Sequence, residues 1–266
     1  MSKVLRKRLG FGLTAVTSAV LLSSCSNDTE WGRIGMPDPA TEEAPRILNL
    51  WQGSWIASMA VGVLVWALLI FAIIVYRRKD GDDVPEQTKY HVPLEIMYTI
   101  VPLIMILALF WFTARDQKIL TENPGDQKHT VNVNGWRWSW GFNYIEEDAY
   151  DVGTPGERPV LWLPVDEKVK FTLTSQDVIH SFWIPAFLTK MDIIPGQTNE
   201  FTVTPNKLGV FPGKCAELCG VDHARMIFDV KVVSRAEFDA HIAELKAKGQ
   251  SGIIDTGRVV DAGAGE

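Results

Sequence analysis

Two cysteines, two histidines and a methionine in this 266-residue chain have the residue types and the spacing of a metal site. Cys215 and Cys219 lie four positions apart. His223 and Met226 follow in the same short segment, and His180 lies upstream at the end of another predicted strand. Thiolates, imidazoles and a thioether are the ligands that favour copper over magnesium or calcium. This set of residues therefore predicts a copper site.

The same residues allow three other interpretations. A disulfide between Cys215 and Cys219 fits an oxidising compartment, and zinc also binds thiolates and imidazoles. A mononuclear blue-copper site uses two histidines, one cysteine and a distant methionine. Each of these leaves at least one member of the set without a role, whereas two copper ions bridged by two thiolates use every member. A bridged centre shares the oxidised charge between both metals, which suits one-electron transfer.

These motifs resemble those of cytochrome c oxidase subunit II, over about residues 51–233. The matching patterns are His180-Ser181 followed by Pro185, Lys190-Met191-Asp192 before Ile194-Pro195-Gly196, and C-x-E-x-C-x-x-x-H-x-x-M from Cys215 to Met226. The resemblance implies a cupredoxin-like Greek-key barrel joined to a membrane hairpin of two helices. It also implies that electrons pass from a c-type cytochrome to the haem of subunit I, where oxygen is reduced to water and protons are pumped.

The resemblance also implies a role for each residue of the site. Cys215 and Cys219 are implied to bridge the two copper ions. The other implied ligands are His180 and Met226 for one ion, and His223 and the backbone carbonyl of Glu217 for the second. The side chain of Glu217 is implied to bind a magnesium or manganese ion shared with subunit I.

Two further residues match the family's motifs. Trp136 begins the run Trp-Arg-Trp-Ser-Trp, and the family's first tryptophan is where electrons arrive from the cytochrome. Alternating aromatic residues on a strand also suit a barrel core, and we expect that simpler role for Trp138 and Trp140. Glu95 begins the pattern E-x-x-x-T-x-x-P, in which the family's glutamate stands at the mouth of a proton path into subunit I. The alternative is that this carboxylate only stabilises a helix dipole.

Two apolar stretches precede the site and predict a membrane hairpin at residues 50–114. Residues 56–76 carry no charge, and residues 96–113 are apolar with one internal proline. About 20 such residues in a helix cross the ~30 Å hydrocarbon core of a bilayer. Three basic residues directly follow the first stretch, so the connecting loop is expected in the cytoplasm and the copper domain outside the cell membrane. A buried hairpin of a soluble protein is the alternative for the second stretch.

The segment from residue 115 to 234 is expected to form the copper domain. From residue 130, short runs with period-two alternation are separated by Pro, Gly, Asp and Asn, which favours an antiparallel sandwich or barrel. Residues 235–266 are expected to form a short amphipathic helix and a flexible glycine-rich tail. The acidic segment 144–158 is either a docking loop for the donor or a solvated connection between strands.

The first 24 residues have the order of an export signal, with basic residues, an apolar run and small residues before Cys25. Residues 22–25 resemble a lipobox, in which the cysteine becomes the lipidated first residue of the mature protein. Cleavage near an unmodified cysteine is the alternative. Residues 25–49 would then form an extracytoplasmic segment. Loss of this basic signal would make the formal net charge more negative than −6, which argues against nucleic-acid binding.

The complete ligand set separates this chain from related proteins. Quinol-oxidase subunit II lacks the copper ligands, and nitrous oxide reductase is soluble and much longer. A membrane-tethered copper carrier would need fewer ligands and no second helix. The chain contains no C-x-x-C-H motif for a fused cytochrome. We therefore expect a subunit of a proton-translocating oxidoreductase whose partners are subunits I and III, a c-type cytochrome, free or in a neighbouring complex, and membrane lipid.

Overall fold

The computed structural model describes residues 29–78, 84–85, 87–122, 125–153 and 158–254. The predicted signal peptide and Cys25 lie outside the described residues, as do residues 255–266. The chain divides into two compact units, and each is described by itself. One consists of Asn49–Ile119, and the other combines Met1–Leu48 with Leu120–Glu266.

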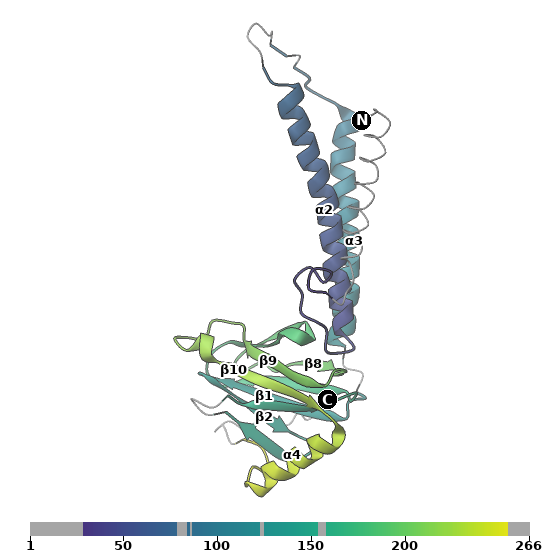
Figure 1. The fold of residues 1–266 in the computed structure, drawn as a ribbon. Coiled ribbons are helices and arrows are strands. Elements are labelled where there is room, and N and C mark those ends of the chain that lie inside the picture. The colour runs from purple at the N-terminus through teal and green to yellow at the C-terminus, as the bar shows by residue number, and fades with distance from the viewer. Residues whose placement is uncertain (1–28, 79–83, 86, 123–124, 154–157, 255–266) are drawn as a thin grey trace, which may run out of the picture. The chain divides into compact units, whose positions relative to one another are not determined.

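The first unit consists mainly of parts of two long helices, α2 (Ala44–Val75) and α3 (Val92–Thr121) (Figure 1). Their most apolar windows have mean hydropathies of 2.8 and 2.2, and no residue of either window is buried. Both helices are long and apolar enough to cross a membrane. A soluble hairpin would have to cover these side chains, so their exposure favours the predicted membrane hairpin. Helix α3 continues through Pro102.

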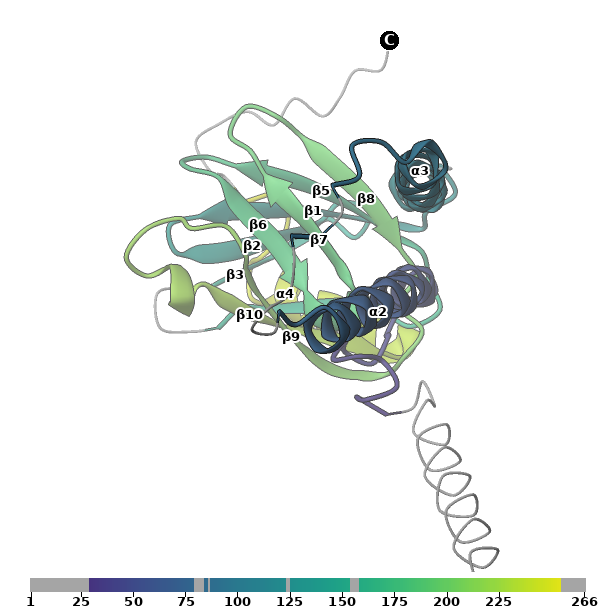
Figure 2. The same cartoon turned by 90° about the horizontal axis from the view of Figure 1, so that it is seen from above.

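The second unit contains a sandwich of two five-stranded sheets (Figure 2). The first sheet has the order β3-β2-β1-β5-β8 and comprises β1 (His129–Trp136), β2 (Ser139–Tyr144), β3 (Ala149–Val152), β5 (Val169–Ser175) and β8 (Asn199–Val203). The second has the order β4-β10-β9-β6-β7 and comprises β4 (Val160–Pro164), β6 (His180–Ile184), β7 (Thr189–Ile193), β9 (Gly209–Cys215) and β10 (Ile227–Val233). Strands distant in sequence lie side by side, as in a Greek key. The predicted cupredoxin-like fold is confirmed.

Large aromatic side chains fill the space between the two sheets. Phe182 and Phe228 stack with ring centroids 5.0 Å apart, and Phe171 lies 5.5 Å from Phe182. All three rings are buried, as are the thiol of Cys215 and the thioether of Met226. The sulfur-bearing side chains of the predicted metal site therefore belong to the same hydrophobic core, and its close packing restricts their movement.

The acidic segment 144–158 begins as the turn between β2 and β3. Its Glu146 side chain accepts a hydrogen bond from the Thr130 hydroxyl (2.7 Å), and Glu147 lies 2.5 Å from the ring of His129. These two carboxylates are therefore bound within the domain, and residues 149–152 of the segment form strand β3 itself, so the segment is more than a connection between strands. Residues 154–157 lie outside the described part of the chain.

Segments at both ends complete the second unit. Before α2, the backbone of Ala40 donates to Ala186 O (2.9 Å) and accepts from Asn206 N (3.1 Å). After β10, helix α4 (Arg235–Ala247) is held at its start by a capping box between Ser234 and Glu237. Two 3₁₀ turns, η1 (Pro185–Phe187) and η2 (His223–Arg225), lie in loops of the second sheet.

The segment after α4 differs from the flexible tail expected at the C-terminus. Residues 250–254 follow a defined path against β3, where Ala149 and Ser251 form an antiparallel bridge. The glycine-rich composition did not indicate this, because the partners of the bridge lie about a hundred residues away in the chain.

Candidate metal centre

Strand pairing brings the predicted ligands together. Cys215 ends β9, and it pairs with Phe182 of β6, two residues after His180. The loop of residues 216–226, here called the metal loop, leaves β9 at Cys215 and returns to β10 at Met226. Its two ends are joined because Cys215 N donates to Met226 O (3.0 Å), and Ala216 N donates to the carbonyl of Ser181 (3.0 Å).

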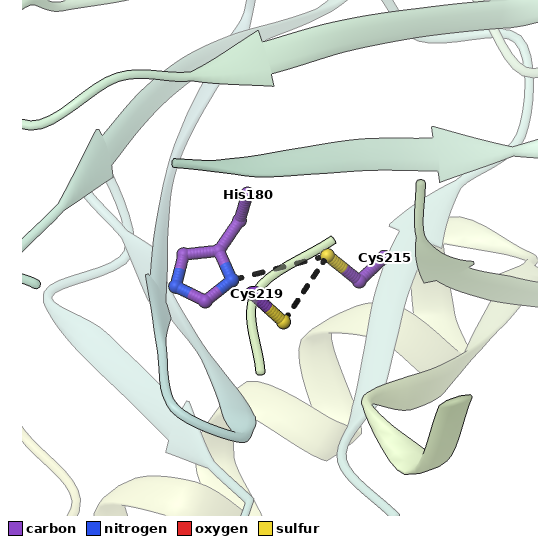
Figure 3. A group of neighbouring side chains, drawn as sticks. All are labelled: His180, Cys215 and Cys219. Atoms are coloured by element: carbon purple, nitrogen blue, oxygen red, sulfur yellow. Dashed lines mark hydrogen bonds between the residues drawn. The ribbon is translucent and has the colours of Figure 1, made fainter. Parts of the chain in front are cut away.

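The side chains converge around the two thiols. Cys215 Sγ lies 3.8 Å from His180 Nδ1 and 3.9 Å from Cys219 Sγ (Figure 3). The remaining separations are Cys219 Sγ to His223 Nδ1 (3.5 Å), Cys219 Sγ to Met226 Sδ (3.7 Å) and Cys215 Sγ to Glu217 O (3.2 Å). The six predicted donor atoms are thus all close to a thiol sulfur, and the two cysteines are thiols rather than a disulfide.

The composition of the site fits copper better than zinc. His180, Cys215, Cys219 and Met226 are all buried, whereas His223 is half-buried. A tetrahedral zinc site would be complete with two thiolates and two imidazoles. It would leave the Met226 sulfur, 3.7 Å from Cys219 Sγ, without a function. Two thiolates, two imidazoles, a thioether and a carbonyl instead suit a pair of copper ions.

The two thiols have different acidities in the metal-free chain. Burial opposes ionisation of Cys215, but hydrogen bonds from His180 and from the backbone lower its pKa. Burial and the neighbouring Cys215 charge raise the pKa of Cys219. The site is therefore prepared to hold one thiolate, and metal binding at the second sulfur must release a proton.

Asp177 orients the buried ligand His180, although the sequence analysis did not identify it. His180 Nδ1 faces Cys215 Sγ and Nε2 lies 2.9 Å from Asp177 Oδ1, so with a metal ion at Nδ1 the Nε2–H would donate to this carboxylate. The same carboxylate accepts from Arg137 N (2.8 Å) and Val178 N (2.7 Å). Partial burial opposes its ionisation, but the hydrogen bond from His180 and those from the backbone lower the pKa of Asp177 to about 2.

Two tryptophans hold the metal loop. Trp138 Nε1 donates to Cys219 O (3.3 Å), and Trp140 Nε1 donates to Met226 O (3.3 Å). Gly220 has φ +127°, and a Cβ there would lie 3.1 Å from the Trp138 indole. Trp140 is fully buried, as expected of a core residue. Both indoles therefore also fix the backbone of the ligand-bearing loop, which strand alternation alone did not indicate.

Trp136 lies outside the cluster of ligands and is half-buried at the end of β1. Its neighbour Arg137 donates its backbone N–H to Asp177, which in turn binds His180. A short covalent and hydrogen-bonded route therefore joins Trp136 to a predicted ligand.

Glu95 belongs to the helical unit and stabilises the start of α3. Its carboxylate accepts from His91 N (3.0 Å), and its backbone carbonyl accepts from the Thr99 hydroxyl (2.8 Å). The helix-stabilising alternative thus has a geometric basis. The side chain of Glu217, in the other unit, is exposed on the metal loop.

Two membrane-length helices joined to a cupredoxin-like sandwich with a soft-ligand site define a membrane-bound cupredoxin protein. Two family descriptions match the chain: Cytochrome C oxidase subunit II, transmembrane domain, over residues 29–114, and Cytochrome C oxidase subunit II, periplasmic domain, over residues 156–233. The chain belongs to the cytochrome c oxidase subunit II family, and is thus a subunit of a haem-copper oxidoreductase.

Two relatives, compared by sequence, agree with this assignment. A probable cytochrome c oxidase subunit 2 from Streptomyces avermitilis is 48% identical, over 92% of this chain and 90% of the relative. The cytochrome c oxidase subunit 2 of Mycobacterium bovis is 32% identical, over 85% of this chain and 78% of the relative. The solved periplasmic domain of subunit II of cytochrome oxidase (CoxB) of Bradyrhizobium japonicum is 33% identical, with a TM-score of 0.44, over 46% of this chain and 96% of that domain.

Proposed function

We propose that this chain accepts electrons from a c-type cytochrome at two thiolate-bridged copper ions and passes them to the haem of subunit I. There oxygen is reduced to water and protons are pumped. The observation that carries the proposal is the convergence of the six predicted donor atoms, from His180, Cys215 and the metal loop, around the two thiols. Bound copper would supply one-electron redox chemistry. The proposed bridging residues are Cys215 and Cys219, and the proposed terminal ligands are His180, Met226, His223 and the carbonyl of Glu217.

The protein's own contribution is to fix the positions of these ligands and to exclude water from them. Asp177 holds the His180 ring, Trp138 holds the metal loop at Cys219, and Cys215 N is tied to Met226 O. Because their positions are already fixed by hydrogen bonds, the ligands need little rearrangement when the charge of the site changes. The burial of four of them excludes water, which would otherwise reorganise around each new charge.

Trp136 is proposed as the residue at which electrons arrive from the cytochrome. The route through Arg137 and Asp177 to His180 supports this role. Trp136→Gln in the assembled oxidase should keep the copper content and donor affinity but slow electron input by orders of magnitude, because the lost group is a conductor. Trp136→Phe, which keeps an aromatic ring, should lose less. Fast input with only a weaker donor affinity would make Trp136 a docking contact.

A magnesium or manganese ion shared with subunit I is proposed at Glu217. The support is that its side chain is exposed while its carbonyl faces Cys215 Sγ. Glu217→Gln should remove bound manganese from the assembled oxidase, as measured by electron paramagnetic resonance, and leave the copper signal in place. Full retention of manganese would reject this site.

Glu95 is proposed to stand at the mouth of a proton path into subunit I. Its position in the first turn of α3 is consistent with a place at the membrane surface. Glu95→Gln can still accept the hydrogen bond from His91 N, so the helix start should survive while proton uptake slows. Unchanged proton uptake would leave Glu95 with the capping function alone.

The N-terminus is proposed to carry an export signal through residue 24 and a lipid on Cys25. The mature chain would then lie in the cell membrane with its copper domain outside, beside subunits I and III. Because α2 and α3 anchor the chain by themselves, Cys25→Ala should abolish lipid labelling without releasing the protein from membranes. Mass spectrometry that finds an unmodified Cys25, or a signal still attached, would contradict the proposal.

A further inference from the structure

The segment of residues 250–254, here called the C-terminal strap, is built onto the first sheet. It runs along β3, which forms one edge of that sheet. Its backbone contacts are Tyr150 N to Gln250 O (3.0 Å), Gly252 N to Asp148 O (3.3 Å) and the bridge between Ala149 and Ser251. The strap therefore covers a strand edge that would otherwise expose its polar backbone groups.

The end of the strap is fixed by a buried amide network on the outer face of the sheet. Ile254 N donates to Asn143 Oδ1 (2.8 Å), and the amide of Asn143 donates to Asn132 Oδ1 (3.0 Å). Asn134 also donates to Asn132 Oδ1, at 2.8 Å. The three asparagines are buried, so each of their polar atoms needs a partner. The N–H of Ile254 is such a partner, which makes the strap an integral part of the fold.

The side chains of Ile254 and Trp136 both lie over Gly141. A Cβ added to Gly141 would lie 2.5 Å from Ile254 Cδ1 and 3.0 Å from two atoms of the Trp136 ring. Any side chain at residue 141 would therefore displace one of them, and glycine is needed because of this close approach. Two residues more than a hundred positions apart thus share one contact point on β2.

We propose that the C-terminal strap holds the indole of Trp136 in the orientation used for electron input, with Ile254 as a positioning residue. This inference rests on the proposed role of Trp136. Electron transfer falls steeply with distance and depends on ring orientation, so a loosened indole transfers electrons more slowly. The strap acts on the ring and not on the metal ligands, because its contacts lie on the first sheet while His180 and Cys215 belong to the second.

Two truncations of the chain in the assembled oxidase test the proposal. Truncation after Gly249 removes the strap, whereas truncation after Asp255 keeps it and serves as the control. Hydroxyl-radical labelling of Trp136, resolved by mass spectrometry, should rise several-fold only in the shorter chain. The rate of electron transfer from a flash-reduced c-type cytochrome to the copper site should fall several-fold in the same chain. The copper content and the KM for the cytochrome should stay unchanged. Unchanged labelling and input in the shorter chain would overturn the proposal.

Point variants keep the test decisive if the shorter chain fails to assemble. Ile254→Ala should raise the labelling of Trp136 and slow electron input, and Ile254→Leu should restore both. Unchanged labelling in Ile254→Ala would overturn the positioning role while leaving the function of Trp136 intact. Fast electron input in Trp136→Gln would instead overturn the proposed function of Trp136, whatever the labelling of the Ile254 variants shows.

Discussion

At the scale of single residues, the two cysteines are held by different parts of the fold. Cys215 ends a strand and is fixed by sheet pairing to β6, while Cys219 is held in the metal loop by the indole of Trp138. Both sulfurs lie within 4 Å of two or more other predicted donor atoms. The two thiols therefore have different roles, because Cys215 faces His180 and Cys219 faces His223.

Cys215→Ser and Cys219→Ser should each abolish the two-copper centre, since a hydroxyl is a poor substitute for a soft bridging thiolate. Met226→Leu removes only one weak ligand and should keep a copper signal with a shifted potential. Copper content and electron paramagnetic resonance measure both effects. An unchanged two-copper spectrum in either serine variant would reject the bridging roles.

Asp177→Ala should weaken copper binding by about 10- to 100-fold, because the ring of His180 loses the carboxylate that orients it. Asp177→Asn still offers an acceptor to Nε2 and should lose much less. Competition with a chelator measures both affinities. Equal affinities in the alanine variant and the parent would mean that core packing alone orients His180.

The ligand residues could be predicted from their types and spacing, but the residues that support them could not. Trp138 and Cys219 are 81 positions apart, and Asp177 connects to Arg137 across 40. Such contacts exist only after the strands pair. The carboxylate three residues before His180 was a usable local signal for orientation of the ring.

At the scale of elements, strands with one buried face were predictable and strands that serve the site were not. Strand β5 alternates fully between buried and half-exposed residues, so its period is visible. Strand β9, Gly-Val-Phe-Pro-Gly-Lys-Cys, contains two glycines and a proline and buries only two residues. Strand β6 buries His180 and Ser181 beside Phe182, which hides its alternation. The alternation of buried and exposed residues is therefore least regular in the strands that carry the predicted metal ligands.

Helix α4 is expected to dock more weakly in acid because of His241. Its ring stacks on Trp162 at 4.2 Å, and burial lowers its pKa from 6.5 to about 4. Between these values the unfolded chain binds a proton that the folded chain does not, so the free energy of unfolding falls as the pH decreases. His241→Phe keeps a ring on Trp162 but cannot titrate. Its melting temperature should therefore fall less than that of the parent between about pH 7 and about pH 5.

A second variant separates titration from stacking at His241. His241→Gln should share the weaker pH dependence of the phenylalanine variant, but it should melt at a lower temperature at neutral pH because no ring covers Trp162. If all three proteins respond equally to acid, other groups cause the loss.

At the scale of the whole molecule, the residues before α2 are part of the β-rich unit. Ala40 and Thr41 are fully buried, and the carboxylate of Glu43 accepts from Thr204 N at 3.0 Å. The copper domain thus contains residues that precede the membrane hairpin in the sequence as well as residues that follow it. The boundary predicted at residue 115 could not include these residues, because their partners near Thr204 follow them by about 160 positions.

Glu43→Ala should lower the free energy of unfolding by about 1–3 kcal/mol, because it leaves the Thr204 N–H without its charged acceptor. Glu42→Ala is the matched control, since only the backbone of Glu42 binds Thr204. Thermal unfolding of the purified chain in detergent compares the two. Equal losses would mean that the Glu43 carboxylate is not specifically required.

The most direct test of the central claim is the copper content and electron paramagnetic resonance spectrum of this chain, purified apart from the haem-bearing subunit and loaded with copper. The convergence of two thiols, two imidazoles and a thioether predicts a purple protein with two copper ions per chain and one unpaired electron shared between them. A blue protein with one copper ion per chain and a single-copper spectrum would contradict it.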